Sequence, residues 1–170
     1  FAGGLNSSAT SLNVIEFSTI ATLGNSTDFG DLTQARDQFT GLADTTRGIF
    51  AGGVEQPGTQ FNTIDFVTIA TTGNAQDFGD MSGVNTGCAG SSNSTRGVLS
   101  VAYTAPTYLN TIDFITIQSA GNAQNFGDLT LARYLSASMS NSIRAVFAGG
   151  GSPSATNTID FVTIATRGDA

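Results

Sequence analysis

The chain has 170 residues, of which 39% are hydrophobic and only 11% are charged, and Gly, Ser, Thr and Asn fill much of the remainder. This balance is atypical of helical proteins, which use Lys, Glu, Leu and Ala on their surfaces, and the twelve Phe residues argue against disorder. A net charge of −7, with six Arg and no Lys or His, works against nucleic-acid binding, and no apolar stretch is long enough to predict a membrane span.

Three sequence patterns recur along the chain at an almost constant interval. In chain order they are an apolar segment ending in Gly-Gly, an Asn-Thr-Ile-Asp-Phe segment and an Asp-Phe-Gly-Asp segment. Residues 1–170 therefore form one array of about three and a half repeats of about 48 residues. The Asn-Thr-Ile-Asp-Phe pattern, by which the repeats are aligned with one another, occupies residues 13–17, 62–66, 110–114 and 157–161.

Each repeat is predicted to contain four short strands. Residues 49–53 are apolar and compact, and residues 62–69 alternate between two faces. Residues 72–75 have the composition of a turn, residues 77–80 are predicted to be extended, and a strand of small residues is expected over 84–89. One repeat cannot cover both faces of its own sheet, so we expect the repeats to stack and to bury their Phe rings between them.

One segment of each repeat varies in length. Nine positions separate Gly4 from Asn13 and seven separate Gly150 from Asn157, whereas Leu32 and Arg47 and their equivalents are always fifteen apart. In repeat proteins such variable loops gather on one face, often the binding face. An alternative is that they only cap the strand edges. The variable loops are residues 5–12, 54–61, 103–109 and 151–156, and the residues expected to stack on or hydrogen-bond a sugar or a protein strand are Asn6, Gln56, Tyr103 and Tyr108.

The titratable residues do not indicate an active site. Without His or Lys, the remaining general bases are Asp and Glu, and one acid recurs in every repeat, which is typical of a framework role. We expect these acids to accept backbone amides or to pair with an arginine such as Arg47, Arg96 or Arg144. A ring of acids lining an ion channel is the alternative. The acids are Glu16, Asp65, Asp113 and Asp160.

Three other features are expected to be structural. The two carboxylates around Phe29 lack the spacing of a calcium loop, and Arg167-Gly168-Asp169 aligns with the ordinary turn Thr72-Gly73-Asn74. Cys88 is expected to be a buried, inert thiol. No catalytic residue, cofactor or metal site is predicted.

The repeat resembles the kelch repeat. The features that carry the resemblance are the apolar strand, the Gly-Gly, the strand with a central acid, the Gly-Asn turn and the following aromatic residue and Ala-Arg. The resemblance implies an all-β fold, a β-propeller built of four-stranded kelch-like blades. Because the sequence starts and stops inside a repeat, we expect it to be part of a longer propeller that is completed by further repeats or subunits. The chain differs in having Phe29, Phe78 and Phe126 where kelch repeats usually have Trp, and Val101-Ala102 in place of one Gly-Gly.

The amino-acid sequence of the repeats resembles that of repeat proteins encoded by marine bacteriophages, cyanophages among them. An example is Asn-Thr-Ile-Asp-Phe followed by Gly-Asn-Ala-Gln-Asp-Phe-Gly-Asp. This similarity implies a non-enzymatic structural or binding module of a phage tail or fibre, located in the virion or outside the cell. Its partners would be other virion proteins or a host-surface protein or glycan. The alternative is a bacterial secreted or cell-surface adhesion propeller. An enzyme is a third possibility, but kelch-type oxidases need His metal ligands and this chain has no His.

Overall fold

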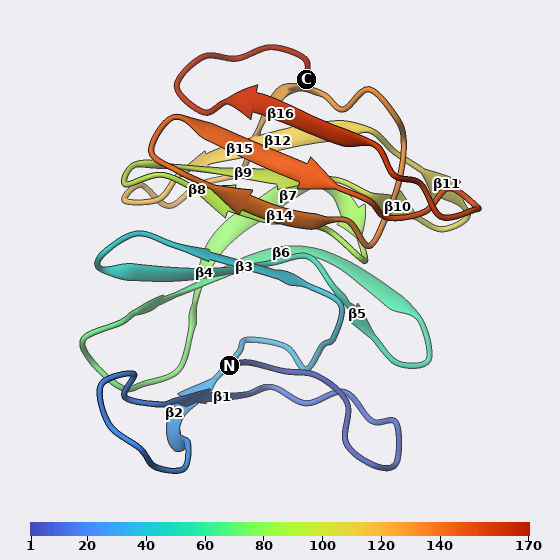
Figure 1. The fold of residues 1–170 in the computed structure, drawn as a ribbon. Helices are drawn as coiled ribbons and strands as arrows, with labels where there is room; N and C mark the ends of the chain where they lie inside the picture. The colour runs from blue at the N-terminus through green and yellow to red at the C-terminus, as the bar shows by residue number, and fades with distance from the viewer.

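The structure is a computed structural model that describes residues 1–170, and it contains sixteen β-strands and no helix. The strands form four antiparallel sheets and one separate hairpin. Figure 1 shows the blue first sheet at the bottom, the second sheet above it, and the third and fourth sheets overlapping in the upper half, with red β16 uppermost. The all-β expectation is therefore confirmed, and no closed ring of sheets is present.

The second and third sheets each contain four consecutive main strands that pair in an antiparallel meander. The second sheet consists of β3 (Thr40–Ala43), β4 (Arg47–Ala51), β6 (Thr59–Thr68) and β7 (Gln76–Asn85), and β5 (Val54–Glu55) forms a short hairpin with the start of β6. The third sheet consists of β8 (Gly90–Ser92), β9 (Arg96–Ser100), β12 (Thr111–Thr116) and β13 (Gln124–Asp128). The separate hairpin, β10 (Tyr103–Thr104) and β11 (Thr107–Tyr108), lies between β9 and β12 in the chain.

The first and fourth sheets have fewer strands. The first sheet pairs β1 (Val14–Phe17) with β2 (Thr27–Asp31), and a single bridge joins Ala2 to Ile15. The fourth sheet consists of β14 (Ala137–Ser140), β15 (Arg144–Ala148) and β16 (Ile159–Thr163). The same order of strands and turns thus recurs from sheet to sheet.

Two predicted strand boundaries were wrong. The strand expected over residues 49–53 ends at Ala51, because Gly52 and Gly53 have φ angles of 70° and 109° and turn the chain out of the sheet. No strand forms over residues 84–89 beyond the end of β7 at Asn85, and Gly87 has a φ of 66°. The small-residue strand of that repeat is β8, at Gly90–Ser92.

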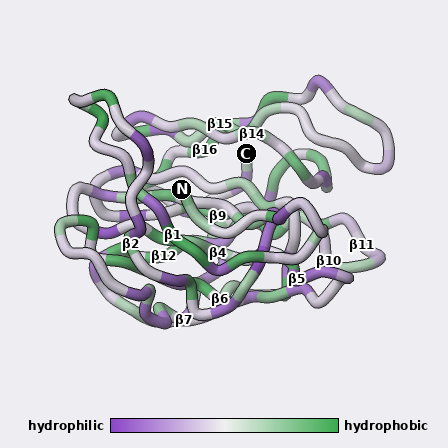
Figure 2. Tube along the Cα trace, turned by 90° about the horizontal axis from the view of Figure 1, so that it is seen from below, coloured by the Kyte–Doolittle hydropathy of each residue, from purple (hydrophilic) through white to green (hydrophobic).

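The hydrophobic core lies between the sheets, as the stacking expectation requires. One cluster joins the second and third sheets, a second joins the third and fourth, and a smaller one joins the first and second. Figure 2 shows hydrophobic stretches in the middle of the view, where β4 and β12 lie. The buried side chains of the first two clusters include Ile49, Ile64, Phe78, Leu99 and Ile115, and Val98, Ile112, Phe126, Phe147 and Val162.

Not every Phe ring expected to be buried is covered. Phe78, Phe126 and Phe147 are buried, whereas Phe1 is 84% exposed and Phe161 is 52% exposed. The two exposed rings belong to the first and fourth sheets, each of which packs against another sheet on one face only.

Candidate functional site

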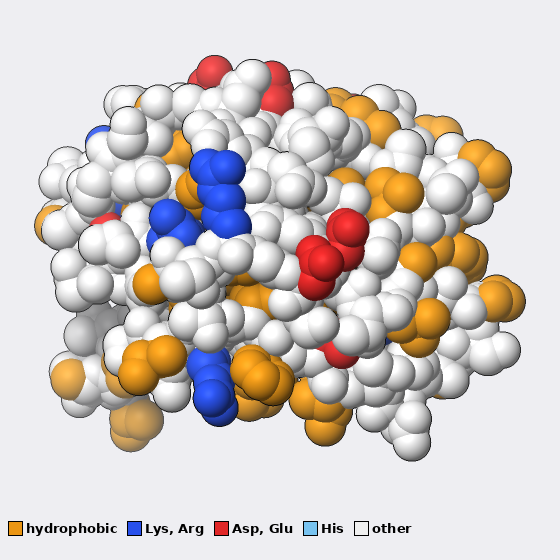
Figure 3. All heavy atoms as spheres, turned by 90° about the horizontal axis from the view of Figure 1, so that it is seen from above, with side chains coloured by type: hydrophobic (Ala, Val, Ile, Leu, Met, Phe, Trp, Pro, Cys, Tyr) orange, Lys and Arg blue, Asp and Glu red, His pale blue; other side chains and the backbone are white.

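The four variable loops lie together at one end of the stacked sheets, and we call them the loop row: residues 5–12, 54–61, 103–109 and 151–156. In Figure 1 the hairpins that contain β5, β10 and β11 project at the same side of the molecule. Figure 3 shows hydrophobic side chains gathered toward this side on the face seen from above. The gathering of the variable loops on one face, predicted from their length variation, is therefore observed.

Hydrogen bonds join the first three loops of the row. The backbone N–H of Gln56 donates to the hydroxyl of Ser11 at 3.0 Å, which joins the first loop to the second. The side chain of Gln60 then donates to the carbonyl of Tyr103 at 3.1 Å and accepts from the N–H of Ala105 at 2.9 Å. These loops present one fixed surface, because each is held by its neighbour as well as by its own sheet.

A pocket of about 220 Å³ lies between the second and third loops of the row. Gln56, Gln60 and Tyr103 come from the loops themselves, and Gln38 and Thr86 come from the segments that precede β3 and β8. Hydroxyl and amide groups therefore face the pocket beside an aromatic ring. Such a lining suits a neutral polar ligand, since aromatic area supplies contact and amides fix orientation. The remaining lining residues are Val54, Pro57, Gly58 and Ala105.

The three tyrosines of the chain form one cluster next to this pocket. The ring centroids of Tyr103 and Tyr108 are 5.0 Å apart, and Tyr134 lies 5.7 Å from the first and 5.4 Å from the second. All three side chains are half-buried, so part of each ring faces solvent. Tyr134 pairs through its backbone with Gly151, which links the third loop to the fourth.

The four candidate binding residues have different places in this arrangement. Gln56 and Tyr103 both line the pocket, whereas Tyr108 does not line it but packs against Tyr103. Asn6 does not line it, because its side-chain oxygen accepts from the N–H groups of Ser8 and Thr10 and so holds its own loop. Sequence reasoning missed Tyr134, which lies outside the variable loops. The signal available for it was that the chain has only three tyrosines.

Three of the four recurring acids, Asp65, Asp113 and Asp160, are part of the framework, whereas Glu16 is exposed and its side chain makes no hydrogen bond. The arginine partners predicted for these acids were wrong. Asp65 pairs with Arg36 at 2.9 Å and Asp160 pairs with Arg133 at 2.7 Å, with all four side chains buried. As predicted, these acids also accept backbone amides, from Thr33, Thr130 and, for Asp113, Ser82.

The expected partners begin strands and stack on phenylalanines instead. The guanidinium carbons of Arg47 and Arg96 lie 4.6 Å from the ring centroids of Phe66 and Phe114. Arg144 lies 4.8 Å from Phe161 in the same way.

Asp113 is an exception among the acids. Asn85 stands where the neighbouring repeats have an arginine, and one oxygen of the buried Asp113 carboxyl has no hydrogen-bond partner. Burial therefore raises the pKa of Asp113, and the hydrogen bonds from Ser82 offset only part of that effect. For Asp160 burial also acts to raise the pKa, but hydrogen bonds from Thr130 and Arg133 outweigh it and lower the pKa.

The other polar candidates are not arranged as a reactive centre. Burial raises the pKa of the Cys88 thiol to about 12, and the thiol donates to the carbonyl of Ala51, so the expected buried cysteine is observed. No three His, Cys, Asp or Glu side chains are grouped in a way that would hold a metal ion. No helix of the chain is long and apolar enough to cross a membrane.

Neither a protein-family model nor a curated protein matches the chain.

Proposed function

We propose that the chain is a non-enzymatic recognition module of a phage tail or fibre, and that its loop row binds a glycan or protein segment on the host surface. We further propose that the four sheets are consecutive kelch-like blades of a β-propeller. The four-stranded meanders of the second and third sheets and the face-to-face packing of neighbouring sheets support this reading of the fold.

The tyrosine cluster beside the glutamine-lined pocket is the observation that carries the proposed function. Tyrosines supply large, rigid contact area with a polar tip, and they are enriched where proteins bind other molecules. The amides of Gln38, Gln56 and Gln60 add donors and acceptors without charge. A sugar has the matching chemistry, because it presents apolar ring faces and hydroxyl groups together.

The loop row is also built as recognition surfaces commonly are. Its residues lie in the segments that connect the main strands of each sheet, and the paired and packed strands behind them hold these segments in place. The hydrogen bonds between Gln56 and Ser11 and between Gln60 and Tyr103 hold the loops in place before a ligand binds. They therefore reduce the conformational entropy that the loops would lose on binding. Variation of loop length then changes specificity without changing the framework.

Mass spectrometry of purified particles of the phage that encodes the chain tests the virion part of the proposal. We expect peptides of the chain in the particles, at a copy number comparable with tail proteins. Their absence from particles, together with presence of the chain on a bacterial surface, would favour the adhesion module instead. Binding by the loop row is tested separately with the variants described in the Discussion.

A further inference from the structure

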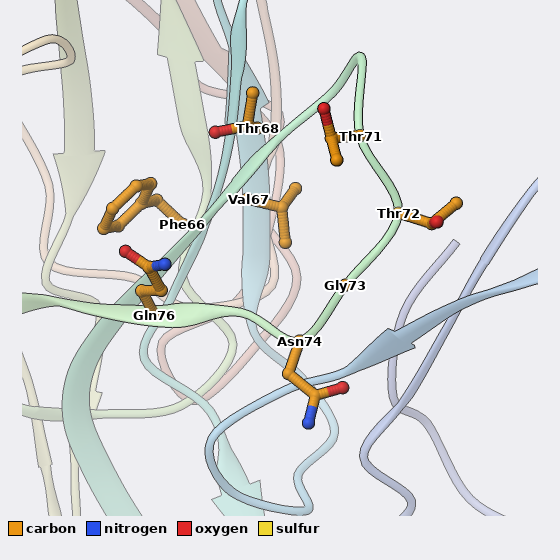
Figure 4. A pocket seen from close by; sticks show the side chains of 8 residues that line it. All are labelled: Phe66, Val67, Thr68, Thr71, Thr72, Gly73, Asn74 and Gln76. Atoms are coloured by element: carbon orange, nitrogen blue, oxygen red, sulfur yellow. The ribbon is translucent and has the colours of Figure 1, made fainter.

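A second kind of hollow lies at the other end of the strands, beside the turns that follow β6 and β12. The hollow after β6 has a volume of about 290 Å³ and the one after β12 about 170 Å³. Equivalent residues of the two repeats line them: Phe66, Asn74 and Gln76 in the first, and Phe114, Asn122 and Gln124 in the second. In Figure 4 the side chains of Phe66 and Gln76 lie close together on one side of the first hollow.

An arginine of the chain occupies the position beside the second hollow. The guanidinium carbon of Arg167 lies 4.5 Å from the ring centroid of Phe114. Its Nη2 donates to Oε1 of Gln124 at 2.6 Å. The guanidinium thus stacks on one aromatic ring and donates a hydrogen bond to one amide oxygen. This combination suits a planar cation with several N–H donors.

The turn that carries Arg167 is docked in the same way as the corresponding turn one repeat earlier. Gly168 N–H donates to the carbonyl of Phe126 at 3.0 Å, and Gly121 N–H donates to the carbonyl of Phe78 at 2.7 Å. The next residue of each turn accepts from a backbone N–H of the preceding sheet, at 3.0 Å for Asp169 and 3.1 Å for Asn122. The residue before Gly121 therefore holds, relative to Phe66, the position that Arg167 holds relative to Phe114.

That residue is Ala120, whose methyl group is too short to reach the ring. Phe66 is accordingly only half-buried, whereas Phe114 is 7% exposed. The side-chain amide of Gln76 makes no hydrogen bond within the chain, although the equivalent Gln124 accepts from Arg167. The first hollow thus has the groups that receive Arg167 in the second repeat, but no counterpart of Arg167.

We propose that the hollow over Phe66 binds the arginine side chain of a protein partner. The aromatic ring of Phe66 and the amide oxygen of Gln76 receive the guanidinium, as Phe114 and Gln124 receive Arg167. The net charge of −7 favours approach of a cationic partner. The site is separate from the loop row, since β6 begins at its hairpin with β5 and ends at Thr68, which lines this hollow.

A nearby arginine does not prevent this binding. Arg47 lies 4.6 Å from the Phe66 centroid, and Arg96 has the same distance from Phe114, where a second guanidinium is nevertheless present. Both of these arginines donate to backbone carbonyls of the next sheet, Arg47 to Ile117 at 3.0 Å and Arg96 to Ile164 at 2.8 Å. Each arginine is thereby held in place by a hydrogen bond to the next sheet.

Titration with the peptide acetyl-Gly-Arg-Gly-amide, followed by NMR of the Gln76 side-chain amide, tests the proposal. The same peptide with citrulline in place of arginine is the matched control, because it keeps the shape and lacks the charge. We expect saturable binding at millimolar concentration by the arginine peptide and binding about tenfold weaker by the citrulline peptide. Equal binding of the two peptides, or no shift at Gln76, would overturn the proposal.

Two variants make the test independent of any single result. Ala120→Arg supplies the guanidinium from within the chain and should abolish peptide binding at Gln76, whereas Arg167→Ala should open a second site that is detected at Gln124. Both residues are exposed in turns, and thermal unfolding checks that each variant folds. Undiminished binding by Ala120→Arg would contradict the assignment, and so would a Gln124 amide that does not respond in Arg167→Ala.

Discussion

Arg36 donates from Nη2 to Oδ2 of Asp65 at 2.9 Å, and both side chains are completely buried. Arg36 follows β2 and Asp65 lies in β6, so the ion pair joins the first sheet to the second. The hydroxyl of Thr33 donates to the other carboxylate oxygen at 2.6 Å. Arg133 and Asp160 repeat this arrangement between the third and fourth sheets.

Removal of one partner of this pair should be costly. Arg36→Met leaves the carboxylate of Asp65 buried without a countercharge, and we expect the free energy of unfolding to fall by about 3–5 kcal/mol. Urea unfolding of the purified chain measures it. Arg47→Met is the matched control, because it removes a guanidinium that stacks on Phe66 at the surface, and its cost should be about 1 kcal/mol. Equal losses for the two variants would contradict the assigned role of the buried pair.

Asp113 should destabilise the chain at neutral pH. Its pKa is raised above the ordinary 3.8 by burial, so the folded state favours the protonated acid. Asp113→Asn keeps the shape and removes the uncompensated charge, and we expect a gain of about 1 kcal/mol at neutral pH. Chemical unfolding of both proteins between acid and neutral pH measures the difference.

The pH dependence of that gain has a defined direction. Below the ordinary pKa the acid is protonated in both the folded and the unfolded chain, so the variant should gain little. As the pH rises through the raised folded-state pKa, the wild type loses stability that the variant keeps. Asp160→Asn is the contrasting control, because the pKa of Asp160 is lowered and its charge stabilises the fold at neutral pH. A gain for Asp113→Asn that shrank with rising pH would refute this account of the site.

Asn85 stands where the neighbouring repeats have an arginine, and Val101-Ala102 stands where they have Gly-Gly. We expect the effects of these two replacements on the free energy of unfolding to be coupled. A Cβ added at Gly53 would lie 3.2 Å from Cδ of Arg36, so the glycine leaves room for the arginine. Asn85 instead accepts from the N–H of Ala102 at 2.8 Å. Asn85→Arg alone should cost about 2 kcal/mol, and about 1 kcal/mol less when Val101 and Ala102 are also replaced by Gly. A double-mutant cycle measures the coupling, and strictly additive costs would argue against it.

Gly79 should not tolerate a side chain. Its φ is 140°, and an added Cβ would lie 2.6 Å from the backbone carbon of Gly121 in the docked turn. Gly121 has a φ of 152° but nothing within 4 Å of an added Cβ. Gly79→Ala should therefore lower the free energy of unfolding by at least ~2 kcal/mol more than Gly121→Ala, which carries backbone strain alone. Similar thermal unfolding midpoints for the two variants would show that the turn can move away.

Several features were predictable from sequence because they depend on local pattern. The period placed β6 and the extended segment of β7, and the length variation of the loops identified the end of the sheets at which they gather. The ion pairs were not predictable in this way. Arg36 and Asp65 are 29 residues apart, and only the stacking of one sheet on the next brings them together, whereas Arg47 recurs more visibly and stacks on Phe66. Tyr134 was missed for the same reason, since its place in the tyrosine cluster depends on contact between repeats.

Recognition by the loop row is tested most directly by measuring how the purified chain binds intact host cells. Tyr108→Ala removes one half-buried ring of the tyrosine cluster, and Gln56→Ala and Tyr103→Ala alter the pocket itself. The matched control is Gln118→Ala, an exposed glutamine that follows the end of β12 opposite to the loop row. We expect Tyr108→Ala or Tyr103→Ala to weaken binding by about 30-fold, or ~2 kcal/mol, with Gln118→Ala unchanged and all variants equally folded. Wild-type affinity in the tyrosine variants would contradict the assignment of recognition to the loop row.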